Sequence, residues 1–192
     1  MSDPIEVLDF WLGELQPKDW YAGGDDLDAL IRDRFADLWQ AAHDGGLEHW
    51  VESPPGALAY IIICDQFSRN IHRGKAESFA TDPQARAAAN KALEAGWDLE
   101  VPEPERQFFY MPFEHHENPD DQALALRLMQ ERMSSMPDMV LHARAHQEMI
   151  RRFGRFPLRN EALGRENTPE EQAFIEAGGY RTLLEELKSS HA

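Results

Sequence analysis

Residues 168–179 read TPEEQAFIEAGG, and this stretch carries helix signals at both of its ends. Thr168 is suited to cap the first turn, Pro169 fits the first helical position, and Glu171 completes a capping box with Thr168. The two glycines that follow end the pattern, because glycine readily adopts the backbone conformation found after a helix. Similar signals recur along the chain, so we expect an all-α protein.

Other periodic stretches extend this interpretation toward the N-terminus. Residues Asp25 to Gly45 repeat apolar side chains at helical spacing. Thr81–Gly96 and Pro137–Gly154 open with a capping residue or proline and end at glycine. Further helices are expected at Ile5–Leu12, Pro55–Phe67, Glu103–Phe113, Asp120–Met133 and Tyr180–Lys188. No stretch alternates as a strand does, and the short connections favour consecutive antiparallel helices.

The length and the apolar content bound the class of protein. A chain of 192 residues with 42% hydrophobic residues fits one folded domain, residues 1–192. The longest apolar run, Ala57–Cys64, is too short to cross a bilayer, and no cleavable leader is apparent. Cys64 is the only cysteine, which agrees with a reducing compartment, and its place after an apolar run indicates a core thiol. We expect a cytoplasmic protein.

The charge of the chain excludes some partners. A formal net charge of −16 argues against binding to nucleic acid or to an anionic membrane. Phosphate-loop, dinucleotide-binding, nucleophile-elbow and paired Cys-x-x-Cys motifs are absent, and no cofactor is expected. The arginines are unevenly placed, which allows a local positive pocket within an acidic protein. They gather at Arg69, Arg73, Arg151, Arg152, Arg155, Arg159 and Arg165.

Three polar segments are the candidates for function. The first, DQFSRNIHRG at residues 65–74, directly follows the buried run. Asp65 and Arg69 are four residues apart, so the simplest interpretation is a helical ion pair with Asn70 capping the helix end. The alternative is a ligand site that also includes Arg73.

The second segment, FEHHENPDDQ at residues 113–122, places two histidines among carboxylates. Imidazole and carboxylate groups can bind a divalent metal, but no spacing defines a set of ligands on one face. The acids after Pro119 also suit the first turn of a helix, where the macrodipole favours negative charge. We therefore predict no metal site and keep Glu114 and His115 as ligand-binding candidates.

The third segment, HQEMIRRFGRFPLRN at residues 146–160, is the most informative. His142 and His146 share one helical face, where a histidine is more often a hydrogen-bonded core residue than a catalyst. Arginines and phenylalanines then alternate through a glycine-proline turn. Guanidinium groups bind carboxylate or phosphate in bidentate fashion, which makes Arg155, Arg159 and the following Asn160 candidates for ligand binding.

Taken together, these motifs resemble the bacterial domain of unknown function family 924, and the resemblance spans nearly the whole chain. That family is related to tetratricopeptide-like folds, so the resemblance implies antiparallel helix pairs stacked in a superhelical bundle. Leu158 and His116 depart from the residues usual in the family. The motifs that carry the resemblance are VLDFW at 7–11, DQFSRN at 65–70, PFEH at 112–115, RFGRFP at 152–157 and GRENTPEE at 164–171.

The sequence leaves three hypotheses open. The first is a small acidic metabolite bound between helices, with Asp65 or Glu114 as a base and His146 as an acid if a reaction occurs. The second is a helical scaffold that binds a peptide or protein. The third is an internal ion-pair network without a ligand. The ligand-binding hypothesis expects one site, formed by Asp65, Arg69, Asn70, Arg73, Glu114, His115, His146, Arg155, Arg159 and Asn160.

Overall fold

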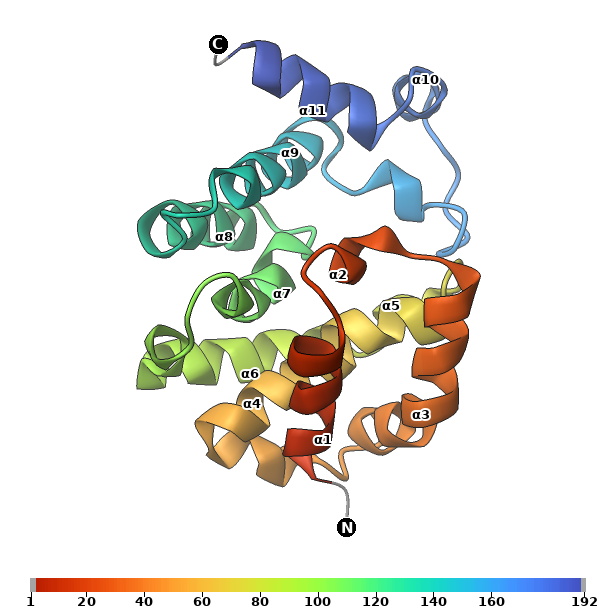
Figure 1. Cartoon of the computed structure of the whole chain (residues 1–192). Coiled ribbons are helices and arrows are strands. Elements are labelled where there is room, and N and C mark those ends of the chain that lie inside the picture. The colour runs from red at the N-terminus through yellow and green to blue at the C-terminus, as the bar shows by residue number, and fades with distance from the viewer. Residues whose placement is uncertain (1–2, 191–192) are drawn as a thin grey trace. The chain divides into compact units, whose positions relative to one another are not determined.

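A computed structural model describes residues 3–190 of the chain, and within that range every regular element is a helix (Figure 1). The all-α prediction is confirmed. The chain divides into two compact units, unit 1 up to Pro112 and unit 2 from Phe113 onward. The single domain over residues 1–192 and its superhelical stacking remain predictions.

Unit 1 is built from short and long helices with several tight turns. Its longest helices are α3, with 19 residues, and α6, with 14 residues. Tight 3-10 turns occupy Glu48–Glu52, Ala76–Phe79, Trp97–Glu100 and Glu105–Phe109. The α-helices are α1 (Pro4–Leu8), α2 (Asp19–Ala22), α3 (Asp25–His43), α4 (Pro54–Ile61), α5 (Ser68–Ile71), α6 (Asp82–Ala95) and the start of α7 (Met111–Glu114).

The predicted helix ends are confirmed for the capped helices and are wrong in the proline-containing stretch before α7. Gly96 ends α6 with φ 74°, as the glycine signal indicated. The predicted helix over Pro55–Phe67 instead runs on as a wider π-helical segment, Ile62–Phe67, and then as α5. The predicted helix over Glu103–Phe113 is wrong: a 3-10 turn precedes α7, because the prolines at 104 and 112 lack the N–H that a continuous helix requires.

The core of unit 1 is aromatic. Phe35 and Phe67 lie 4.7 Å apart between ring centroids; Phe10 contacts both rings, and Trp11 contacts Phe67. Trp11, Trp20, Trp39 and Trp50 are buried, while Trp97 is half-buried. Aromatic rings bury large apolar areas, so this cluster fixes the helices that carry the first polar segment.

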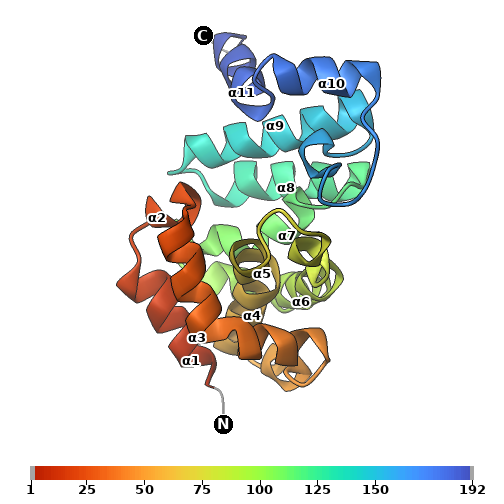
Figure 2. The ribbon, with the colours of Figure 1, turned by 90° about the vertical axis from the view of Figure 1, so that its right-hand side faces the viewer.

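Unit 2 consists of a helical hairpin covered by a further helix. α8 (Pro119–Arg132) and α9 (Pro137–Phe153) lie side by side, joined by a short connection (Figure 2). α11 (Tyr180–Ser189) packs on α9, and α10 (Pro169–Glu176) precedes it. The predicted capping box between Thr168 and Glu171 is present.

The core of unit 2 gathers on one face of α9. Ala145, Met149 and Ile150 are buried there together with Phe156 and Leu183. Gly154 ends α9 with φ 68°, and the chain then turns back so that Phe156 enters the core. None of the helices in the described part of the chain combines the length and the apolar character needed to span a bilayer.

Candidate functional site

The polar segment of unit 1 forms two ion-pair groups on adjacent turns. Arg69 lies 3.2 Å from the Asp65 carboxylate and 3.1 Å from that of Asp82, which confirms the predicted helical pair. Asp65 is 1% exposed, so this pair is buried and not a surface feature. Burial tends to lower the pKa of Arg69, but the two carboxylates outweigh it and raise that pKa.

Asn70 and Arg73 make a second group around Asp28, a residue that the sequence did not single out. Asn70 donates to Asp28 over 2.8 Å and does not cap its own helix, while Arg73 binds the same carboxylate with two nitrogens. Asp28 is 5% exposed. An acid in the first turn of a long helix is commonplace, so nothing in the sequence marked Asp28 as a buried partner.

The second and third polar segments contact each other within unit 2 through Glu114 and His146. Glu114, at the end of α7, is 4% exposed, and its carboxylate lies 2.8 Å from Nδ1 of His146 in α9. Burial raises the pKa of Glu114, but the neighbouring histidines, above all His146, outweigh burial and lower it. Glu114 is therefore ionised at neutral pH.

The two acceptors around His146 fix its tautomer. Nδ1 lies 2.8 Å from the Glu114 carboxylate and 2.9 Å from the backbone oxygen of His142. Because both neighbours only accept, Nδ1 of His146 carries a proton. No hydrogen bond within residues 3–190 uses this Nε2, and the His146 side chain is 19% exposed.

Aromatic and imidazole rings surround His146. His115 lies 5.9 Å away between ring centroids, Tyr180 5.2 Å and Phe156 5.5 Å. On the same Phe156 ring stacks the Arg159 guanidinium, 4.4 Å from the centroid. His146 and Arg159 both contact Phe156, and His115 contacts His146; we call His115, His146 and Arg159 the histidine cluster.

His142 and Tyr180 support the cluster from one side. The Tyr180 hydroxyl lies 2.6 Å from Nδ1 of His142, and the two rings stack. Burial lowers the pKa of His142, and burial together with the Glu114 charge raises that of Tyr180. Both side chains are therefore neutral near pH 7. Sequence reasoning missed Tyr180, which follows a glycine pair and resembles an ordinary first residue of a helix.

The remaining arginines of unit 2 hold the loop that follows α9. Arg155 binds Glu171 with two nitrogens at 2.6 and 2.7 Å and the Glu166 backbone oxygen at 2.8 Å. Asn160 donates to the Glu171 carboxylate at 3.2 Å, and Arg155 above all lowers the pKa of Glu171 to about 2. We call Glu171 with these partners the Glu171 lock. Because the Arg155 guanidinium is bonded to Glu171 and to the Glu166 backbone, this arrangement favours the ion-pair hypothesis over the ligand-binding hypothesis for Arg155.

A second arginine pairing ties the loop to the segment after α7. Arg165 binds Glu117 with two nitrogens at 2.7 and 2.9 Å. The same glutamate accepts the backbone N–H of Phe156 at 2.8 Å, which positions the ring under the histidine cluster. Burial tends to raise the pKa of Glu117, but Arg165 and the Phe156 amide lower it.

Within unit 2, Glu114, His115 and His146 lie together, and their role as one binding site remains a prediction. Asp65, Arg69, Asn70 and Arg73 belong to unit 1, and their participation in the same site remains a prediction. Cys64 is buried, and burial raises its pKa, as expected for a core thiol. Among residues 3–190, no group of three or more His, Cys, Asp or Glu side chains is arranged to hold a metal ion.

Comparison with known proteins agrees with the resemblance seen in the sequence. The family model described as bacterial protein of unknown function (DUF924) matches residues 7–179. The solved structure of a protein of unknown function from Agrobacterium tumefaciens is 39% identical and superposes with a TM-score of 0.85. The match covers 91% of this chain and 97% of that one. No curated protein matches the chain.

Proposed function

Since the chain belongs to this bacterial family of unknown function, we propose a function from its own side chains: unit 2 binds a small acidic ligand, a carboxylate or a phosphate, at the histidine cluster. The observation that carries this proposal is the state of His146. Its Nδ1 is held by two acceptors, and no hydrogen bond within the described residues uses its Nε2.

The chemistry of the cluster favours an acid as its ligand. A neutral imidazole Nε2 accepts the O–H of a monoprotonated phosphate or carboxylic acid. After proton uptake, the same nitrogen donates to the anion, and the buried Glu114 carboxylate stabilises the imidazolium that forms. The ligand would thus gain a charge-assisted hydrogen bond in a protein that is acidic overall.

The loop arginines have a supporting role in this proposal. Arg155 and Asn160 are joined to Glu171, and Arg165 is joined to Glu117, so their bonds order the chain around Phe156. The ligand contacts would then come from the histidine cluster. Asp65, Arg69, Asn70 and Arg73 of unit 1 remain predicted contributors, and any catalysed reaction would use His146 as the proton carrier.

Calorimetric titration of the full chain with inorganic phosphate and with succinate tests the proposal. His146→Asn retains an amide donor near the position of Nδ1 and removes Nε2, so it separates ligand binding from the contact with Glu114. We expect it to weaken binding at least about tenfold, the loss of one charge-assisted hydrogen bond. His49→Asn, at an exposed histidine of unit 1, is the matched control. Absence of binding by both acids, or equal affinity in His146→Asn, would refute the proposal.

A further inference from the structure

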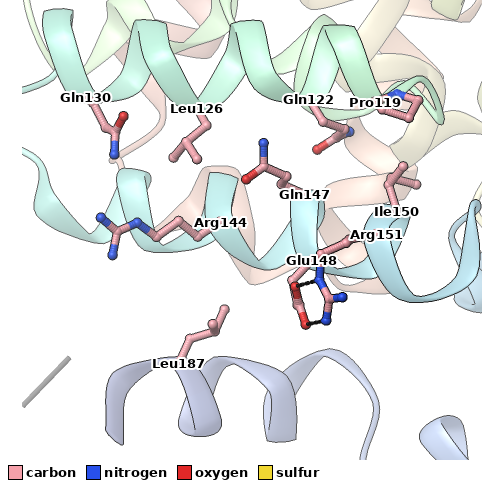
Figure 3. A pocket seen from close by; sticks show the side chains of 10 residues that line it. All are labelled: Pro119, Gln122, Leu126, Gln130, Arg144, Gln147, Glu148, Ile150, Arg151 and Leu187. Carbon is pink, nitrogen blue, oxygen red and sulfur yellow. Dashed lines mark hydrogen bonds and ion pairs between the residues drawn. The ribbon is translucent and has the colours of Figure 1, made fainter. Parts of the chain in front are cut away.

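Unit 2 contains a pocket that is separate from the histidine cluster. It measures about 750 Å³ and lies among α8, α9 and α11 (Figure 3). On α9, Arg144, Gln147 and Glu148 line it, and at 100° per residue they point away from the side that carries His142 and His146. The lining residues are Pro119, Gln122, Leu126, Gln130, Arg144, Gln147, Glu148, Ile150, Arg151 and Leu187.

Gln122 lies in the wall of this pocket and holds a buried acceptor. Its side chain is 1% exposed, and its amide nitrogen donates to the backbone oxygens of Glu114 and His116, both at 2.6 Å. Those two carbonyls fix the orientation of the carboxamide, so Oε1 faces the other way, between α8 and α9 (Figure 3). Within residues 3–190 this Oε1 has no hydrogen-bond partner. A buried acceptor without a donor is unfavourable.

Gln147 and Arg144 add further groups without partners. In the described part of the chain, no hydrogen bond or ion pair joins either side chain to another residue, and both are half-buried. Glu148, by contrast, is bound by Arg151 and Arg152, which lower its pKa to about 2. Arg144 is therefore the lining cation whose charge no carboxylate offsets.

The remaining lining residues define the shape of the ligand. Leu126, Ile150 and Leu187 supply apolar walls between the polar groups. Gln122 and Gln130 are eight residues apart on α8, which corresponds to about 12 Å along the helix. An extended chain rises about 3.3 Å per residue, so a segment of three or four residues matches this length.

We propose that this pocket binds the C-terminal end of an extended peptide with apolar side chains. A peptide backbone offers both donors and acceptors to the Gln147 carboxamide. Its terminal carboxylate pairs with Arg144, and a side chain packs on Leu126 and Ile150. This site is independent of the acid-binding function proposed for the histidine cluster, because it uses other residues on another side of α9.

The test is titration of the full chain with N-acetyl-leucyl-alanyl-leucine as free acid, as C-terminal amide, and with free leucine as the small-acid comparison. The free-acid peptide should bind, and amidation should weaken binding at least about tenfold because Arg144 loses its partner. Arg144→Met should weaken the free acid equally and leave the amide unaffected. Gln147→Ala should weaken both peptides several-fold, as expected for the loss of about 1 kcal/mol of hydrogen bonding.

Two controls keep the outcome specific. Arg127→Met removes an exposed arginine of the same helix pair outside the pocket and should change nothing. His146→Asn should leave peptide affinity intact, so a failure of the histidine cluster is distinguishable from a failure of this pocket. The proposal is overturned if the free-acid peptide does not bind, if Arg144→Met has no effect on it, or if leucine binds as tightly as the peptide.

Discussion

Two buried glutamates of unit 2, Glu114 and Glu171, each pair with a cation, and the partners differ in what they can do. Arg155 binds Glu171 with two nitrogens, and a guanidinium does not lose its proton near neutral pH. His146 binds Glu114 with one nitrogen, and an imidazole, unlike a guanidinium, can accept as well as donate a hydrogen bond. Glu171 thus forms a permanent cross-link with Arg155. Glu114 instead holds one nitrogen of a histidine whose other nitrogen makes no hydrogen bond within residues 3–190.

Breaking the Glu171 lock should give the largest loss of stability. Glu171→Gln removes the charge that Arg155 and the Thr168 N-cap share, so we expect the free energy of unfolding to fall by about 2–3 kcal/mol. Urea denaturation measures this change. Glu170→Gln, at the exposed neighbouring position, is the control and should be nearly neutral. An equal effect of the two substitutions would mean that the lock does not stabilise the loop.

Lowering the pH should act on the region around Glu114 and not on the Glu171 lock, because His142 lies beside His146 and burial lowers the pKa of His142. Burial lowers the pKa of His142 in the folded state, so below about pH 6.5 the unfolded chain binds more protons than the folded one. Stability should therefore be full above pH 6.5 and fall as the pH drops, by at most about 1.4 kcal/mol per pH unit for one group. Glu171 stays ionised throughout this range.

Unfolding measured between pH 7.5 and pH 5 in wild type and His142→Gln tests this expectation. His72 of unit 1 also has a pKa lowered by burial, so the variant should keep part of the slope. A slope that is unchanged in His142→Gln would show that His142 does not contribute.

Arg73 extends the comparison to unit 1 with a smaller expected effect. It binds the buried Asp28, but its own side chain is 52% exposed, so solvent screens the pair. Arg73→Ala should cost less than about 1 kcal/mol, because Asn70 still donates to Asp28. Urea denaturation is again the measurement. A loss as large as that of Glu171→Gln would show that exposure is a poor guide to the strength of these pairs.

Metal removal should have the smallest effect of all. The sequence lacks a spacing that would define a closed metal site, so a chelator should leave the melting temperature unchanged. If the chelator lowers the melting temperature and zinc or manganese restores it, the imidazoles of His115 and His116 bind metal. The region around Glu114 would then also be held by a metal ion.

The sequence predicted the helices better than the partners of the polar residues. Capping boxes and terminal glycines act over one turn, so Thr168 and Gly154 could be assigned from their neighbours. The approach of Glu114 to His146 depends on how α7 and α9 pack, which local patterns do not encode. For the same reason, the sequence did not predict the roles of Asp28, Tyr180 and the unpartnered oxygen of Gln122. These roles depend on burial and not on residue type.

The central claim is that Glu114 and the His142 backbone hold the proton on Nδ1 of His146 and leave Nε2 for an acid. Long-range ¹⁵N–¹H NMR spectra of the imidazole rings test this claim directly, with inorganic phosphate as the probe. We expect a protonated Nδ1 and a bare Nε2 for His146 in the free protein, and a change at Nε2 when phosphate is added. A proton on Nε2 in the free protein, or an Nε2 signal that phosphate does not alter, would contradict it.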